Sequence, residues 1–582
     1  MLERRGPDRT FSCDVVVLNW LLCFKSYVLW MQGSEPTVQP VKDDHGNLLL
    51  WNGDIFSGVY EESSVKNKVS DTLVLLQALG ENDSSPENIL HTMMKVYGPW
   101  SMMYWNDKRK TLWFGRDVLG RHSLLWTKSA NGIILSSVSK RGCDEEKCQE
   151  VPALGLFSMD FGAARTEQEF PVPYLHLWDH LMPANISMAD TPVEERILSY
   201  PPLDALKVLT VAWLGIECIL ERFIDLLKTA VKTRVQIQPG LCKDCIKDIS
   251  KNDEKLRCPH SKICVLFSGG IDSTVLAFLS DFFVPDDEPI DLLNVAFSSG
   301  ADGSSRNTSR KECCVNKMPD KFQKSIFEVP DRKTGRLAVA ELKTLCPNRK
   351  WNFVEIDVHI SELREIRQGV ITDLINPLNT VLDDSLGCAM WFAARGCGTI
   401  SSPSRPEGKD CENHRVPYSS PARVRNLPSR NLGRDDRICS DHGRQPRFPF
   451  LDEDVVSFLN SLAPWQKVAA HVDCRKKKGN ERNKQLGVPQ IVPLTIRPGV
   501  GDKALLRLAA LKLGLKEVCS FPKRAMQFGS RIAKLEGKEK ANDVSLLGSG
   551  ADEQLGGYSR HRSALEEGGW LLLAQEMKKQ VP

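Results

Sequence analysis

The chain has 582 residues, of which 41% are hydrophobic and 26% charged, and its formal net charge at pH 7 is +3. This is typical of a globular protein of roughly two to four domains, and the small charge argues against a nucleic-acid or membrane partner. No apolar run reaches the roughly 18 residues of a transmembrane helix. The charged start MLERRGPDRT is unlike a secretory signal, so we expect the 18 scattered cysteines to be reduced thiols in a cytoplasmic protein.

Residues 1–165 predict a β-rich domain of short strands and turns. The apolar segment 15–22 predicts one buried strand. Residues 48–58 predict two extended runs around an Asn-Gly turn, and 98–117 predict two strands around a hairpin turn.

Residues 166–205 are rich in proline and lack periodicity, so we expect a linker there. The remainder, 206–582, predicts an α/β domain with a parallel sheet, because helical and short apolar segments alternate along it. Two segments in it, 401–430 and 474–498, are rich in Ser, Pro and basic residues and predict disordered inserts. The expected helices are 221–235 and 273–283, and the expected strands are 263–267, 290–297 and 351–358.

The strongest functional signal is the sequence SGGIDS at 268–273, where a strand leads through two glycines into a helix. The glycines let the backbone approach an anion, and the first amide groups of the helix point at it. Asp272 suits Mg²⁺ that bridges phosphates. The alternative, a Gly-rich turn with a helix cap, is less favoured in this strand–loop–helix setting, and a Walker-type GxxxxGK[ST] pattern is absent. The residues expected to bind ATP and its pyrophosphate are Leu266, Ser268, Gly269, Gly270, Asp272 and Ser273.

Several motifs resemble those of the glutamine-hydrolysing asparagine synthetase family. SGGIDS is similar to the pyrophosphate motif of N-type ATP pyrophosphatases. The other matches are RGPD (5–8), WNGDIF (51–56), GRDVLGRHSLLW (115–126), NLGRDDR (431–437), RFPFLDEDVV (447–456) and GSGADEQLGGY (548–558). NLGRDDR, GADEQL and KRAMQFGSR (523–531) together resemble one subgroup of that family. The resemblance covers most of the chain outside the two predicted inserts.

The resemblance implies an Ntn-hydrolase-like, class II glutamine amidotransferase domain over 1–165, α+β and rich in strands. A linker at 166–205 then leads to an asparagine synthetase-like PP-loop ATP pyrophosphatase domain over 206–582. The implied reaction adenylates aspartate with ATP and Mg²⁺, releases pyrophosphate, and uses ammonia or glutamine to form asparagine. Aspartate and ammonia or glutamine are therefore the expected small-molecule partners.

The resemblance also assigns site residues. Asp272 and Asp552 match the two metal-binding aspartates of the family. Arg434, Asp435 and Asp436 would lie near the site, although a buried ion-pair network is an equally good interpretation of these three. Lys523 or Arg524 would bring positive charge to the pyrophosphate. The remaining candidates are Gly548 and Gly550 for ATP, with Lys523 and Arg434 as catalytic residues.

The N-terminal part departs from the family pattern. The family nucleophile is a cysteine that directly follows the initiator methionine, whereas this chain begins Met1-Leu2 and its first cysteine is Cys13. We therefore interpret the N-terminus as truncated. Gln32 stands where an arginine is expected to hold the glutamine carboxylate. These differences predict no glutaminase activity, with Asn52, Gly53 and Asp71 as the remnant of a glutamine pocket.

The C-terminal part departs from the pattern as well. Ser549 replaces a glutamate that promotes the ammonia step, and serine is no general base without an activator. The GADE segment follows NLGRDDR here but precedes it in the family, which we interpret as a rearranged chain or gene model. An ATP-dependent amide ligase and a non-catalytic ATP-binding or scaffold protein both stay open. An RNA-adenylating enzyme that carries sulfur on Cys242 and Cys245 is disfavoured by the near-neutral charge and the amidotransferase-like N-terminal part.

Overall fold

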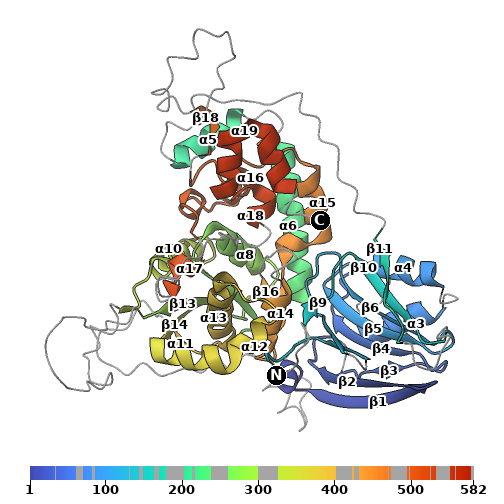
Figure 1. The fold of residues 1–582 in the computed structure, drawn as a ribbon. Helices are drawn as coiled ribbons and strands as arrows, with labels where there is room; N and C mark the ends of the chain where they lie inside the picture. The colour runs from blue at the N-terminus through green and yellow to red at the C-terminus, as the bar shows by residue number, and fades with distance from the viewer. Residues whose placement is uncertain are drawn as a thin grey trace, which may run out of the picture.

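The structure, a computed structural model, describes residues 1–32, 35–59, 70–81, 85–129, 132–142, 148–162, 170–178, 202–212, 216–237, 260–298, 326–400, 422–424, 432–469, 471–472, 494–496, 498–524, 526–532, 551–557 and 559–578. Figure 1 shows a β-rich N-terminal part beside an α/β part that holds the rest of the chain. Among these residues, no helix combines the length and apolarity that crossing a membrane requires.

The N-terminal part is built on an antiparallel six-stranded sheet. A three-stranded sheet, a two-stranded hairpin and two helices pack with it around two apolar clusters rich in tryptophan. The six strands, in sheet order, are β11 (Tyr174–Leu177), β10 (Gly155–Asp160), β6 (Thr111–Arg116), β5 (Trp100–Asn106), β4 (Leu48–Gly53) and β3 (Val41–Lys42). The other elements are β1 (Arg9–Val17), β2 (Trp20–Val28), β7 (Leu125–Ser129), β8 (Gly132–Ser136), β9 (Gln149–Glu150), α1 (Leu2–Arg5), α3 (Asp71–Glu81) and α4 (Pro86–Met94).

Two expectations about this part were wrong. Segment 15–22 is a hairpin rather than one buried strand, because the chain turns between β1 and β2 at Leu18, whose φ is +51°. The apolar residues around that turn are exposed, Val16 at 76% and Leu21 at 62%. The expected linker contributes β11 to the sheet, paired with β10. The hairpin expected within 98–117 is confirmed as β5 and β6, whereas only the first of the two runs expected within 48–58 is a strand, β4.

The C-terminal part contains a mostly parallel sheet in the order β15-β14-β13-β12-β16-β17, with only the β14–β15 pair antiparallel. Alternate residues of β12 face opposite helical layers, so the sheet is buried on both sides. The parallel sheet and its three expected strands are confirmed. The strands are β12 (Ile263–Leu266), β13 (Ile290–Phe297), β14 (Trp351–Val358), β15 (Thr399–Ile400), β16 (Ala422–Val424) and β17 (Pro446–Arg447).

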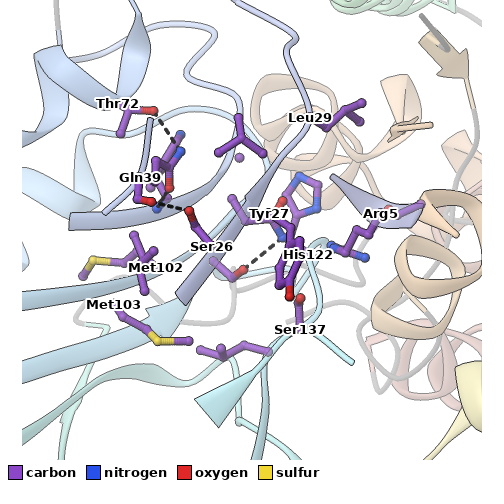
Figure 2. Close-up of a pocket in the computed structure, with 18 of the residues that line it drawn as sticks. Arg5, Ser26, Tyr27, Leu29, Gln39, Thr72, Met102, Met103, His122 and Ser137 are labelled. Carbon is purple, nitrogen blue, oxygen red and sulfur yellow. Dashed lines mark hydrogen bonds between the residues drawn. The ribbon is translucent and has the colours of Figure 1, made fainter. Parts of the chain in front are cut away.

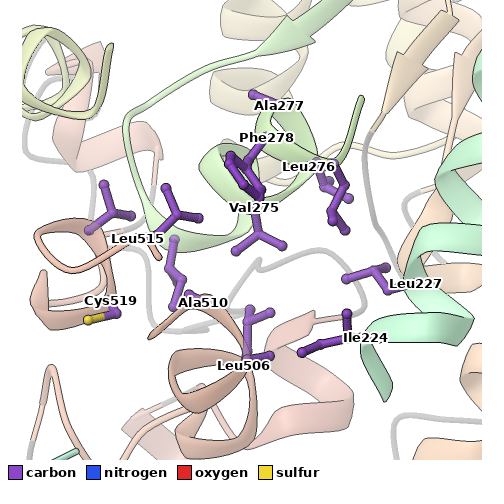
Figure 3. Packing of buried hydrophobic residues seen from close by; sticks show 14 of the residues in the cluster. Ile224, Leu227, Val275, Leu276, Ala277, Phe278, Leu506, Ala510, Leu515 and Cys519 are labelled. Atoms are coloured by element: carbon purple, nitrogen blue, oxygen red, sulfur yellow. The ribbon is translucent and has the colours of Figure 1, made fainter. Parts of the chain in front are cut away.

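One helical layer joins three helices that lie far apart in the sequence. α6 (Ile216–Gln236), α8 (Ile271–Asp281) and α16 (Ala504–Lys512) pack their apolar faces together through Leu227, Val275 and Leu506 (Figure 3). The two expected helices correspond to α6 and α8 and are confirmed. The other helices are α5 (Pro202–Ala212), α10 (Pro330–Leu345), α11 (Ile360–Ile366), the π-helix η3 (Arg367–Ile371), α12 (Thr372–Ile375), α13 (Val381–Arg395), α14 (Leu432–Ser440), α15 (Glu453–Ser461), α17 (Met526–Gly529), α18 (Ala551–Leu555) and α19 (Ser559–Lys578).

Parts of both expected inserts belong to sheets. β16 lies within 401–430 and pairs with β12 and β17, so it occupies the interior of the parallel sheet. Within 474–498, β19 (Leu494–Thr495) pairs with β18 (His471–Val472), and Ile496 is buried. The remainder of each segment, apart from Pro498, lies outside the described residues.

Buried ion pairs join the two parts of the molecule. Arg437 on α14 donates to Ser123 Oγ at 2.8 Å and to Glu150 at 2.9 Å, both in the N-terminal part. Arg121 of the N-terminal part pairs with Glu453 of α15. Breaking a buried pair by removing one partner typically costs about 3–5 kcal/mol, so these contacts hold the two parts in one arrangement.

Candidate functional site

The loop between β12 and α8 is fixed by a left-handed glycine and by close packing. Gly269 has a φ of +74°. A Cβ atom at this position would lie 2.4 Å from the backbone nitrogen of Gly335 and 2.5 Å from the carbonyl oxygen of Thr334, both on α10. The Thr334 hydroxyl also donates to the Ser268 carbonyl at 2.9 Å. The loop backbone is therefore pressed against α10, where no side chain fits.

The amino end of α8 opens at the same loop. Gly270 is its N-cap residue, and Ser273 Oγ donates to the Gly270 carbonyl at 3.1 Å. Asp272 lies in the first turn. Amide groups at the start of a helix lack intrahelical acceptors, so this end of the helix suits an anion.

Strand order places this loop where open α/β sheets bind ligands. β12 lies between β13 and β16, and all three strands are parallel. In such sheets the crevice lies beyond the carboxyl ends of the strands, at the point where the strand order reverses. Ser268 begins that loop, whereas Leu266 is still part of β12 and packs into the sheet core.

Two lysines and two aspartates meet beside the loop. Lys503 Nζ lies 2.8 and 2.7 Å from the two carboxylate oxygens of Asp272 and 2.6 Å from Asp552 Oδ1. The other Asp552 oxygen lies 2.6 Å from Lys523 Nζ. The Lys503 and Asp552 side chains are buried, whereas Asp272 is 36% exposed. The structure thus brings together three residues singled out in the sequence, Asp272, Asp552 and Lys523.

Charge pairing outweighs burial in this cluster. Burial alone would lower the pKa of Lys503, but Asp272 and Asp552 raise it above its usual range. Burial would raise the pKa of Asp552, but Lys503 and Lys523 lower it to about 2. Lys503 and Asp552 are therefore both charged at neutral pH.

Sequence analysis missed Lys503, which holds the cluster together. It is the N-cap residue of α16, with a φ of 54° and a ψ of 37°. This left-handed conformation costs a residue with a side chain about 1–2 kcal/mol, and a cation is unfavourable at the positive end of a helix. The sequence did contain a signal for Lys503. This lysine follows the turn-rich stretch PGVGD, at the N-cap position of a helix, where an uncharged or acidic residue is expected.

Gly557 lets the ion pair form. A Cβ atom there would lie 2.0 Å from Asp552 Oδ1 and 2.5 Å from Lys503 Cε. Its amide also donates to the Asp552 carbonyl at 2.9 Å, just beyond α18. A side chain at position 557 would therefore displace the contact between Lys503 and Asp552. The two glycines predicted to bind ATP, Gly548 and Gly550, lie outside the described residues.

Arg434 lies in a buried ion-pair network. Its guanidinium donates to Asp435 Oδ1 at 3.0 and 2.8 Å and also pairs with Asp383, in the first turn of α13. Asp436, on the same helix α14, instead contacts Arg5 of the N-terminal part. Arg434 and Asp435 thus pair within the ion-pair network, and Asp436 pairs with a residue of the N-terminal part.

A second candidate site is a cavity of about 340 Å³ in the N-terminal part, closed on one side by α14 (Figure 2). Asn52, Gly53 and Asp71, the predicted remnant of a glutamine pocket, line this cavity together with Gln32. Gln32 Nε2 donates to Asp54 Oδ1 at 2.8 Å. The structure therefore brings the remnant residues to one cavity.

Asp71 is unusual among the residues of this cavity. Burial raises its pKa to about 7, and the nearby Asp54 adds to the rise. The Trp51 indole, which donates to Asp71 at 3.0 Å, opposes it. Asp71 therefore exchanges its proton near neutral pH, where an ordinary aspartate is fully ionised.

Comparisons with known proteins concern the whole chain and the N-terminal part that contains the cavity. A family model described as a glutamine amidotransferase domain matches residues 27–141. "Asparagine synthetase domain-containing protein 1" of Bos taurus is 37% identical, over 93% of this chain and 93% of its own length. The proteins of that name from Homo sapiens and Gallus gallus are 36% and 35% identical over 93% of this chain, covering 93% and 94% of their own lengths. A solved structure of glutamine phosphoribosylpyrophosphate amidotransferase from B. subtilis, 12% identical, covers 70% of this chain and 90% of that chain, but its TM-score of 0.24 supports no structural argument.

Proposed function

Because the chain belongs to the family of asparagine synthetase domain-containing proteins, as its motifs predicted, and contains a glutamine amidotransferase domain, we propose that it is an ATP-dependent amide ligase. In the proposed reaction, the side-chain carboxylate of aspartate attacks the α-phosphorus of ATP and pyrophosphate leaves. Ammonia then attacks the acyl-adenylate, so that asparagine forms and AMP leaves. The observation that carries the proposal is the convergence of Asp272, Asp552, Lys503 and Lys523 beside the SGGIDS loop.

Positive electrostatics at this point suit the departure of pyrophosphate. Lys503 contacts Asp272 in the first turn of α8, so its ammonium lies beside the amino end of this helix. Lys523 is 20% exposed, so its ammonium can reach a bound phosphate while it contacts Asp552. Fixed positive groups at the place where negative charge develops are commonly the largest catalytic contribution. The proposed role of both lysines is to stabilise the charge on the leaving pyrophosphate.

Asp272 and Asp552 fit a magnesium ion. Both carboxylates already converge on one cation, the Lys503 ammonium, so their oxygens lie close together. The described residues contain no cluster of three or more His, Cys, Asp and Glu that would hold a metal alone. Mg²⁺ is commonly held by one or two carboxylates together with substrate phosphates, and it would neutralise phosphate charge here. We therefore propose that ATP itself completes the coordination.

We propose that the amidotransferase half does not hydrolyse glutamine. Gln32 is committed to Asp54 and presents an amide, not a cation, to a glutamine carboxylate. Cys23 also lines the cavity, but hydrogen bonding to Asp14 raises the pKa of its thiol, so it is a poor source of thiolate. Free ammonia is therefore the proposed nitrogen donor.

Isotope exchange between ATP and pyrophosphate tests the adenylation step without ammonia. With the full-length chain, ATP and Mg²⁺, we expect exchange that depends on aspartate and asparagine formation once ammonium is added. Asp272→Asn should abolish the exchange, whereas Asp286→Asn, at a fully exposed aspartate, is the matched control. Exchange that persists in Asp272→Asn would reject the assigned site.

A non-catalytic ATP-binding protein of the same family is the second candidate. It is favoured by Ser549, which stands where the synthetase motif has a glutamate. ATP binding that is weakened by Asp272→Asn, with no exchange in the unmodified chain, would support this candidate over the ligase. Absence of both binding and exchange would reject both functions.

A further inference from the structure

A buried histidine–aspartate pair lies between the two parts of the molecule, at the cavity described above. His122 Nδ1 lies 3.1 Å from Asp436 Oδ1, and both side chains are 1% exposed. Asp436 also accepts hydrogen bonds from the Ser123 amide at 2.9 Å and the Ser440 hydroxyl at 3.1 Å, and pairs with Arg5 at 2.5 Å. Burial opposes ionisation of Asp436, but Arg5 and His122 outweigh it and hold its pKa well below the usual range.

These contacts fix the tautomer of His122. An ionised carboxylate only accepts hydrogen bonds, so the proton that joins His122 to Asp436 must be carried by Nδ1. In the neutral ring, Nε2 is then a hydrogen-bond acceptor with a free lone pair. Nε2 is buried and finds no hydrogen-bond partner among the residues that the structure describes. Because His122 lines the cavity, a ligand inside it can supply the missing donor.

The surroundings of His122 combine polar and apolar side chains. Figure 2 shows His122 near Tyr27 and Arg5, while Met102 and Met103 line another part of the cavity. The other wall is α14, which contributes Asp436 and Ser440 to the lining and contacts β17, the edge strand of the sheet that also contains β12. The helix that lines the cavity thus also contacts the sheet that leads into the SGGIDS loop.

We propose that this cavity binds ammonium and that His122 Nε2 removes one of its protons, supplying ammonia for the amide-forming step. The proposal rests on the ligase function given above. One N–H bond of ammonium breaks, its electron pair stays on nitrogen, and the proton bonds to Nε2. The resulting imidazolium is stabilised through Nδ1–H by the Asp436 carboxylate, and its new proton then passes to water.

Other charged and titratable groups share the cavity, and a pH profile must account for them. Arg5 comes from α1, Lys25 and Tyr27 from β2, Asp71 from α3 and Asp436 from α14. Arg5 is neutralised by Asp436, and Lys25 lies over the Tyr27 ring at 5.1 Å. Asp71 and Cys23, whose pKa values are both raised, are therefore the groups whose titration a pH profile must account for.

The first test is binding, because it needs no enzyme activity. Ring-¹⁵N histidine NMR of the full-length chain, assigned by the signal missing in His122→Asn, should show the Nδ1–H tautomer of His122. Ammonium chloride should shift the Nε2 resonance saturably. Potassium chloride should not, because potassium is similar in size to ammonium but donates no hydrogen bond. Equal responses to the two salts, or no response to ammonium, would overturn the proposal.

The second test is kinetic. In His122→Asn the amide nitrogen can still donate to Asp436, but the base is gone. We expect its kcat/KM for ammonium at pH 7 to fall by about 100-fold and its rate to follow the concentration of free ammonia as pH rises. The matched control is His91→Asn, at an exposed histidine on α4.

The two proposals fail differently. Without aspartate-dependent exchange of pyrophosphate in the unmodified chain, the ligase function is wrong, whatever NMR shows. With normal exchange and an unchanged ammonium dependence in His122→Asn, the role of His122 is wrong while the ligase function stands.

Discussion

Replacing Lys503 with methionine removes the cation that joins Asp272 to Asp552 while keeping most of the side-chain volume. Lowering the pKa of Asp552 from 3.8 to about 2 corresponds to roughly 2 kcal/mol of stabilisation at neutral pH, because one pKa unit is worth about 1.4 kcal/mol. Lys523 still contacts Asp552 in the variant and keeps part of this energy. We therefore expect Lys503→Met to lower the free energy of unfolding by about 1–2 kcal/mol at pH 7.

The pH dependence gives this prediction a second signature. A carboxyl group whose pKa is lowered on folding stabilises the protein above its unfolded pKa, and this contribution is lost as the pH falls. The difference between the two proteins should thus be full above about pH 4 and shrink as the pH approaches 2. Urea unfolding followed by tryptophan fluorescence at several pH values measures it.

Lys467 provides the matched control, because it is a second buried lysine in the same part of the molecule. Burial lowers its pKa to about 8, and its described hydrogen bond goes to the Leu459 carbonyl at 2.9 Å. Lys467→Met removes a buried ammonium whose desolvation destabilises the folded protein, and it also removes one hydrogen bond. These two effects oppose each other, so the free energy of unfolding should change by less than about 1 kcal/mol. Equal destabilisation by Lys503→Met and Lys467→Met would refute the reasoning.

Three further predictions concern other contacts. Gly269→Ala places a Cβ atom 2.4 Å from α10 at a positive φ, so ATP binding should be lost by calorimetry and stability should fall by more than about 2 kcal/mol. The pKa of Asp71 is raised on folding, so ionisation of this residue destabilises the folded chain as the pH rises from about 4 to 7. Asp71→Asn should therefore raise the melting temperature at pH 8 but not at pH 4. A change in melting temperature that is the same at both pH values would contradict this. Asp436→Asn leaves the buried Arg5 without its carboxylate and should cost about 3 kcal/mol in urea unfolding, whereas Arg4→Ala, at a half-exposed ion pair, should cost at most about 1 kcal/mol.

The local hydrophobic pattern was enough to predict those helices and strands whose conformation depends on adjacent residues. The alternation of helix and apolar strand predicted α6, α8, β13 and β14, because amphipathic periodicity directly reflects which face is buried. It failed at β16, where polar and proline-rich neighbours hid a three-residue strand. That strand is stabilised by pairing with β12 and β17 on either side, which no local pattern records.

The conformation of the SGGIDS loop was predicted because its elements are contiguous: two glycines, a helix start and Asp272 follow one another along the chain. The residue that completes the cluster, Lys503, lies 231 positions away from Asp272. Asp552 comes from a third segment, and packing of α16 against α6 and α8 and of α18 against α15 and α16 brings the charges within 2.6 Å. The sequence by itself thus determined the family and the strand–loop–helix around SGGIDS, because these reside in adjacent residues. The tertiary structure decided which distant charges meet there and which buried histidine lines the cavity that α14 closes on one side, because both depend on strand order and long-range packing.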